Sequence, residues 1–185
     1  MTYKEYIELA MTTNKQQNFL NQEIKNLSLN ENMLHSILGL VTEENELLFA
    51  FENNDNVNIV EELGDIMWYV ALWSKTTGFI PEIKEKYDPA DGFFKVYELL
   101  DMAKRTLYYK APFDMEQANR YVEHIFNTIN DLCSKLKIDF ENILDININK
   151  LKQRYPNGFD EEKAVKRNTK KEVKVMVETI NKQGS

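Results

Sequence analysis

Glycine and proline are scarce in this sequence, which has six glycines and four prolines in 185 residues. Sandwiches and barrels need many turns, so this scarcity disfavours an all-β fold. It favours long helices joined by a few loops. The chain is long enough for one compact domain with a sizeable core. We therefore expect an all-α helical bundle that occupies residues 1–185 as a single domain.

Cysteine and long apolar runs are also missing. Cys133 is the only cysteine, which excludes an intrachain disulfide or a cysteine-ligated metal cluster within this sequence. The apolar stretches carry polar interruptions and are too short to span a bilayer. The first residues lack the apolar core of a secretory signal. We expect no membrane partner and a cytoplasmic location.

Basic residues are outnumbered, because 23 Lys and Arg stand against 30 Asp and Glu, giving a net charge of −7. General nucleic-acid binding needs a basic surface that displaces counterions from phosphates, so nucleic acid is not an expected partner. An acidic protein that binds a nucleotide would need cations to screen its phosphates.

Apolar residues recur at helical spacing through most of the chain. Two consecutive helices are expected over residues 31–51 and 59–75, with residues 52–58 as the loop between them. Gly78 would end the second helix. Further helices are expected after Thr2, over 93–109, 114–137 and 139–155, and after Asp160.

Two pairs of carboxylates interrupt the apolar pattern of the first two long helices. Glu43 and Glu46 share one helix face, and Glu62 and Asp65 repeat this spacing on the next helix. Like charges at this spacing repel, and carboxylates in apolar surroundings need a cation or a proton. An antiparallel hairpin would bring all four to one point. Four hard oxygen donors suit Mg²⁺, with Mn²⁺ as a substitute.

The same acids allow three other interpretations. In the simplest alternative, the acids are solvent-facing charges on amphipathic helices. A di-iron bundle expects Glu-x-x-His motifs, whereas Asn32 and Tyr121 stand three residues before His35 and His124. An EF-hand is disfavoured because the 52–58 loop has no central glycine.

Three ring-bearing residues near these motifs are expected in the core. Trp68 and Trp73 are five positions apart and therefore face different directions; both are expected in the core, with one of them at the border of the base pocket as the alternative. His35 is expected to be buried and hydrogen-bonded rather than a metal ligand.

The two acidic motifs lie within GLVTEENEL and EELGDIMWYVAL. In this order they resemble the MazG-like, all-alpha nucleoside triphosphate pyrophosphohydrolases, whose relatives include dimeric dUTPases and dCTP pyrophosphatases. The family signature is Glu-x-x-Glu followed by Glu-x-x-Asp on adjacent helices. Residues 147–167 resemble the segment that closes phage-type members. The resemblance covers residues 34–74 and 139–167.

The resemblance implies a Mg²⁺-dependent hydrolase that converts (d)NTP and water to (d)NMP and pyrophosphate, in nucleotide metabolism or housecleaning. It implies metal ligation by Glu43, Glu46, Glu62 and Asp65. It also implies that phosphate or sugar is contacted by Lys150, Arg154 and Tyr155. Many relatives carry a glutamate just before the first metal glutamate, where this chain has Thr42. Glu43 and Glu46 are therefore the expected proton acceptors.

A long block separates the two matched pieces, and its segment FFKVYELLDMAKRTLYYKAPFD resembles the first acidic helix of phage-type members. We interpret residues 34–78 as a catalytic half, 93–167 as a degenerate second half, and 168–185 as a polar tail. The counterparts of Glu43/Glu46 and Glu62/Asp65 would be Lys95/Glu98 and Tyr121/His124.

This interpretation makes the chain a tandem pseudo-dimer, with a homodimer or higher oligomer as the alternatives. Lys104 and Arg105 of the second half would join Lys150 and Arg154 in surrounding the phosphates with positive charge. Two other functions stay open: a non-catalytic helical module that binds nucleotides or a partner, and a hydrolase of a phosphoribosyl-type diphosphate.

Overall fold

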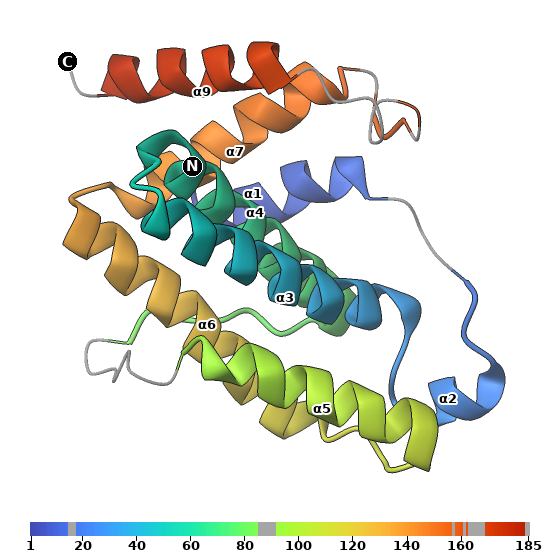
Figure 1. The fold of residues 1–185 in the computed structure, drawn as a ribbon. Coiled ribbons are helices and arrows are strands. Elements are labelled where there is room, and N and C mark those ends of the chain that lie inside the picture. Colours follow the sequence, from blue (N-terminus) through green and yellow to red (C-terminus); the bar gives the residue numbers. More distant parts are fainter. Residues whose placement is uncertain (15–17, 85–91, 157, 161, 163–168, 184–185) are drawn as a thin grey trace.

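The structure is a computed structural model that describes residues 1–14, 18–84, 92–156, 158–160, 162 and 169–183. Over these residues it is helical and has no β-strand, which confirms the all-α fold (Figure 1). The helices are α1 (Tyr3–Ala10), the 3₁₀ helix η1 (Met11–Thr13), α2 (Gln22–Asn26), α3 (Glu31–Glu52), α4 (Asn56–Thr77), α5 (Phe94–Tyr109), α6 (Met115–Leu136), α7 (Phe140–Arg154) and α9 (Thr169–Gln183).

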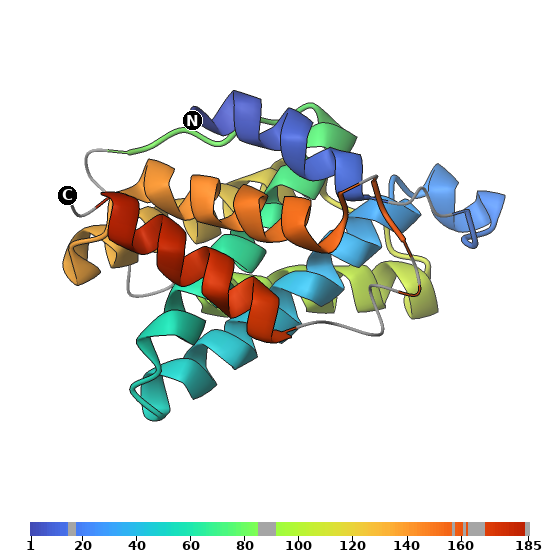
Figure 2. The same ribbon diagram turned by 90° about the horizontal axis from the view of Figure 1, so that it is seen from above.

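Helix α4 lies at the centre of the molecule, where it packs on α3, α7, α1, α6 and α9. Its most extensive contact is with α3, and the two form the antiparallel hairpin that the acidic motifs predict. The α5–α6 hairpin lies on one side of it, and α7 with α9 lies on the other (Figures 1 and 2). This central position lets α4 side chains contact α3, the α6 helix of the second hairpin, and the α7–α9 pair at the same time.

The α3–α4 turn is tighter than the expected loop over residues 52–58. Helix α4 begins at Asn56, because the Asp55 side chain caps it by accepting a hydrogen bond from the backbone N–H of Asn58 at 3.1 Å. Asn54, with φ of 52°, supplies the left-handed residue that a short connection needs. A tight turn fixes the register of the two helices and therefore the register of their carboxylates.

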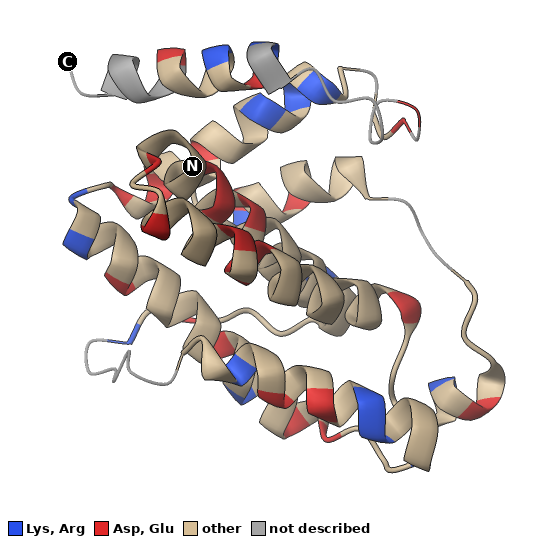
Figure 3. Ribbon diagram, viewed as in Figure 1, with Lys and Arg blue, Asp and Glu red and all other residues tan. Residues whose placement is uncertain are grey.

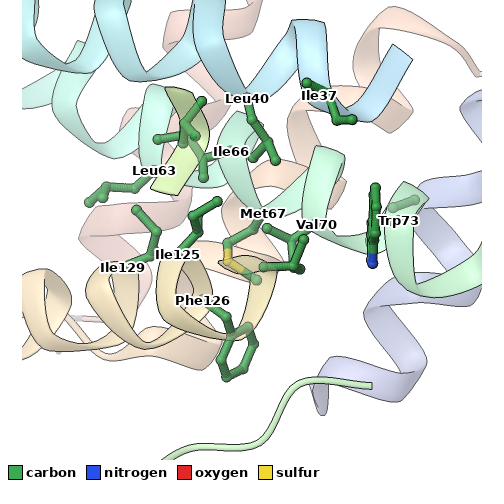
Figure 4. Packing of buried hydrophobic residues seen from close by; sticks show 14 of the residues in the cluster. Ile37, Leu40, Leu63, Ile66, Met67, Val70, Trp73, Ile125, Phe126 and Ile129 are labelled. Carbon is green, nitrogen blue, oxygen red and sulfur yellow. The ribbon is translucent and has the colours of Figure 1, made fainter. Parts of the chain in front are cut away.

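The hydrophobic core joins the two hairpins. Side chains from α3, α4 and α6 interdigitate there, and each is at most 2% exposed (Figure 4): Ile37, Leu40, Leu63, Ile66, Met67, Val70, Trp73, Ile125, Phe126 and Ile129. The Trp73 indole N–H donates to Asn119 Oδ1 at 2.9 Å, so this tryptophan is a satisfied core residue, as predicted. Among the described helices, none has the length and apolarity needed to cross a membrane.

Helix α9 packs along α7 (Figure 2). The Met176 side chain is fully buried and Glu172 is only 3% exposed, although this segment is rich in lysine. Asp160 was expected to cap the last helix, but residues 161 and 163–168 lie outside the described part of the chain. The helix is described from Thr169 onward.

Candidate functional site

Three carboxylates meet between α3 and α4. One oxygen from each of Glu43, Glu62 and Asp65 lies within 4.8 Å of the others. In Figure 3 the acidic segments of the two helices lie beside one another. Glu62 is 8% exposed, and Glu43 and Asp65 are partly buried, so these charges are partly withdrawn from solvent as well as crowded. The hairpin therefore produces the convergence that the motif spacing predicts for these three residues.

The fourth acid of the motif, Glu46, occupies a different place. It lies outside the close group of three but lines the same cavity as Glu43 and Asp65, which has a volume of about 240 Å³. The remaining wall is Thr13, Asn14, His35, Trp68, Tyr69, Leu151, Arg154, Tyr155 and Phe159. The cavity is thus lined by acidic and aromatic residues of α3 and α4 and by residues at the end of α7, which include the cationic Arg154.

Lys150 is the cation nearest to this cluster. Its side chain is 1% exposed, and its Nζ donates to Asp65 Oδ1 at 2.6 Å and to Glu61 Oε1 at 3.2 Å. Burial lowers the pKa of Lys150, but Asp65 and Glu61 outweigh burial and raise it. The ammonium group is therefore charged and directed at carboxylates. It is an internal counter-ion, whereas the resemblance had assigned it to phosphate or sugar.

Two further residues hold Asp65, and sequence reasoning missed both. Asn147 Nδ2 donates to Asp65 Oδ1 at 2.7 Å, and the Tyr6 hydroxyl donates to Asn147 Oδ1 at 2.8 Å. A Cβ on Gly64 would lie 2.9 Å from the Asn147 Cβ, so glycine is what lets α7 approach this closely. The available signal was Asn147, a polar residue among the apolar positions of α7. Nothing in the sequence connects Tyr6 to this site.

Burial and mutual repulsion raise the pKa values of two acids in the cluster. Burial, followed by Asp65 and Glu46, raises the pKa of Glu43 to about 7. Burial, followed by Asp65 and Glu43, raises the pKa of Glu62 to about 9. Without a metal, the folded protein must take up protons here. A cluster of hard oxygen donors that is under-neutralised in this way fits a divalent cation such as Mg²⁺.

We expect the metal-free protein to lose stability as the pH rises from about 6.5 to about 8.5. The folded state keeps a proton on Glu43 up to about pH 7 and on Glu62 up to about pH 9, whereas the unfolded chain releases both near the ordinary pKa of 4.5. Because the native state binds more protons over this range, the free energy of unfolding falls with pH. Mg²⁺ should raise the melting temperature more at the upper pH.

Thermal melts in EDTA and in Mg²⁺ across this pH range measure both effects. The Glu62→Gln variant, which cannot take up the second proton, should show a shallower slope in EDTA. A melting temperature that rises with pH in EDTA would contradict the stated protonation of the cluster.

Aromatic side chains line the same cavity as the acids. Trp68 lines the cavity, and its indole N–H donates to Thr13 Oγ1 at 3.0 Å, so one of the two tryptophans does border the pocket. The Tyr69 ring lies against Gly39, where an added Cβ would come within 2.1 Å of it. His35 is half-buried, and its Nδ1 has no hydrogen-bond partner among the described residues. The predicted hydrogen bond of His35 is therefore not seen at Nδ1.

The expected cationic residues divide into two groups. Arg154 and Tyr155 line the cavity. Lys104 and Arg105 do not: both project from the exposed face of α5, and Lys104 pairs with Asp101 on its own helix. The reason is that α5 turns its buried face, which includes Leu99 and Ala103, toward the rest of the bundle.

The fold and site together define an all-α protein with a partly buried carboxylate cluster at a cavity that is also lined by aromatic residues and Arg154. Residues 31–81 match the family model of the MazG nucleotide pyrophosphohydrolase domain. This match covers α3 and α4 with all four acids of the motif, and it places the segment in the MazG-like superfamily, as the resemblance predicted. It supports nucleotide pyrophosphohydrolase activity at the level of the domain. The chain matches no curated protein and no solved structure.

Proposed function

We propose that this protein is a Mg²⁺-dependent nucleoside triphosphate pyrophosphohydrolase that converts (d)NTP and water to (d)NMP and pyrophosphate. The observation that carries the proposal is the convergence of Glu43, Glu62 and Asp65 at the edge of a cavity. A polyphosphate brings several negative charges into a protein that is itself acidic, so a cation has to mediate its binding.

The three clustered carboxylates, with Glu46 beside them, would hold the metal. When bound, Mg²⁺ polarises phosphoryl oxygens and neutralises charge on the departing pyrophosphate. Lys150 and Asn147 orient Asp65 from behind, which fixes one ligand before substrate arrives. Glu43 and Glu46 are the proposed acceptors of the proton of the attacking water, and Glu46 lies outside the close group of three.

The other cavity residues would bind the rest of the nucleotide. Arg154 and Tyr155 are the proposed contacts to phosphate and sugar, and the aromatic wall around Trp68 is suited to packing against a flat base. Lys150 contributes through Asp65 rather than by reaching phosphate. Neither Lys104 nor Arg105 lines the cavity, so this site gives their predicted role in phosphate binding no support, and that role stays a prediction.

A panel of canonical and modified nucleoside triphosphates, incubated with the protein and Mg²⁺, tests the proposal. We expect pyrophosphate and the monophosphate in equal amounts from at least one substrate, with release abolished by EDTA and restored by Mg²⁺ or Mn²⁺. Calorimetry of Mg²⁺ binding provides a second, independent measurement. No pyrophosphate from any triphosphate together with no Mg²⁺ binding would favour the non-catalytic module. Hydrolysis of phosphoribosyl diphosphates alone would favour the third function.

We also propose that the α5–α6 hairpin is a degenerate copy of α3–α4 within a single-chain pseudo-dimer. The supposed counterparts of Glu43 and Glu62 are Lys95 and Tyr121, and these two also meet, with Lys95 Nζ 5.6 Å from the centre of the Tyr121 ring. A cation–π contact there would replace the carboxylate contact of the first hairpin. Failure of residues 34–78 to superpose on 93–137 would contradict the duplication.

A further inference from the structure

Helix α9 reaches the candidate site through one ion pair. Arg154, at the end of α7, lines the cavity. Its Nε donates to Glu172 Oε1 at 3.0 Å, and its Nη2 donates to Glu172 Oε2 at 2.5 Å. Glu172 is 3% exposed, and Met176, one turn further along α9, is fully buried. The carboxylate is therefore held in place by a docked helix rather than by a surface contact.

The form of this contact leaves part of Arg154 available. A guanidinium is a rigid planar fork, so two parallel hydrogen bonds along one edge fix its orientation. The edge that contains Nε and Nη2 is engaged by Glu172, whereas Nη1 donates to none of the residues that the structure describes. Arg154 can thus present Nη1 to a ligand in the cavity while α9 holds its other edge.

Glu172 and Asp65 are two acidic groups that act on Arg154, and of the two only Glu172 is hydrogen-bonded to it. Burial lowers the pKa of Arg154, but Glu172 outweighs burial and raises it, and Asp65 is close enough to add to the rise. Without Glu172, the competing partners for this buried guanidinium are the cluster acids, above all Asp65. An arginine that turned toward them would neutralise the cluster and would no longer be available for phosphate.

We propose that Glu172 is a positioning residue that acts through Arg154, so that α9 forms part of the phosphate-binding apparatus although Glu172 itself does not line the cavity. This inference rests on the proposed function, because it takes Arg154 to contact the polyphosphate. A carboxylate that aligns one edge of the guanidinium lowers the ordering cost of binding.

A double-mutant cycle tests the inference. The variants are Glu172→Gln, Arg154→Ala and the double variant. The matched control is Glu178→Gln, which removes the same charge from an exposed position of α9. The measurements are kcat and KM for the best triphosphate of the panel, and calorimetric binding of inorganic tripolyphosphate in Mg²⁺. Glutamine replaces one carboxylate oxygen with an NH₂ donor and loses the charge, so it cannot form the two parallel hydrogen bonds but keeps the side-chain volume.

We expect Glu172→Gln to raise KM and the tripolyphosphate Kd about tenfold while kcat changes less than about twofold, as for a lost charge-assisted hydrogen bond in binding. The double variant should be no worse than Arg154→Ala alone, since Glu172 acts through that residue. Glu178→Gln should match wild type. Circular dichroism and melting curves check that α9 remains folded. If Glu172→Gln unfolds, Glu172→Asp enters the same cycle.

Three outcomes would overturn the inference while the proposed function stands. One is an unchanged or lowered KM in Glu172→Gln. Another is additive losses in the double variant, which would show that Glu172 only docks α9. The third is an equal loss in Glu178→Gln. A wild-type protein that neither hydrolyses any triphosphate nor binds tripolyphosphate would instead overturn the proposed function, and the inference with it.

Discussion

Replacing Glu62 with glutamine should reduce pyrophosphate release about a thousandfold and, at the same time, raise the melting temperature of the metal-free protein. The loss follows because a metal ligand supplies several kcal/mol of charge stabilisation to the reaction. The gain follows because the pKa of Glu62 lies at about 9, so the folded protein at pH 7 must protonate a group that the unfolded chain leaves ionised. Glutamine removes that cost.

Opposite effects on activity and stability would separate this site from a structural cluster. Steady-state kinetics with Mg²⁺ and thermal melts in EDTA give the two readouts, and Mg²⁺ should no longer raise the melting temperature of the variant. Asp65 is a poorer target than Glu62, because its removal would leave the buried Lys150 with Glu61 alone.

Glu44 provides a matched control on helix α3. It is 2% exposed, burial raises its pKa to about 7, and it lies outside the cavity. Glu44→Gln should therefore also stabilise the metal-free protein but leave pyrophosphate release within about twofold of wild type. Turnover of Glu62→Gln within about tenfold of wild type would remove the carboxylate cluster from the mechanism.

The second large effect is expected at Lys150. Lys150→Met keeps much of the side-chain volume but leaves Asp65 and Glu61 without their buried cation. Removing one partner of a buried ion pair costs about 3–5 kcal/mol. For a chain of this size, the melting temperature should fall by about 6–20 °C. Mg²⁺ should restore part of the loss, since it supplies positive charge at the same carboxylates.

Lys152→Met is the control, because Lys152 is exposed on the same helix. It should change stability by less than about 0.5 kcal/mol. Differential scanning calorimetry of both variants, with and without Mg²⁺, measures the effects. If Lys150→Met melted within about 2 °C of wild type in EDTA, Lys150 would not be the counter-ion of the cluster, and its assignment to phosphate would regain weight.

Local patterns account for the parts of the fold that the sequence predicts well. The apolar period and the capping residues Asp114 and Asp139 mark the starts of α6 and α7, because helix formation depends on neighbours within one turn. The start of α4 is less evident from the sequence, because its capping residue Asp55 lies within a polar stretch whose composition is typical of a loop. Helix α2 was not predicted, and five residues give too little periodicity to detect.

In the candidate site, too, some features follow from local sequence patterns and others do not. The spacing of Glu43, Glu62 and Asp65 predicts their convergence, because i and i+3 positions share a face and a short hairpin aligns two such faces. The residues that orient Asp65 come from α7 and α1, and their contacts span up to 141 positions of the chain. No local period encodes such a distance.

The order of residues is therefore enough to predict an all-α chain with two acidic helix faces, since both follow from interactions within a helix and one short turn. The packing of the helices sets the rest: Lys150 contacts Asp65, Lys104 and Arg105 are exposed and do not line the cavity, and Glu172 pairs with Arg154. Each of these outcomes depends on which helix packs on which and at what rotation. The packing determines which groups lie near a buried charge. The identity of a lysine or arginine alone does not tell whether it pairs with a carboxylate inside the protein or lies on its surface.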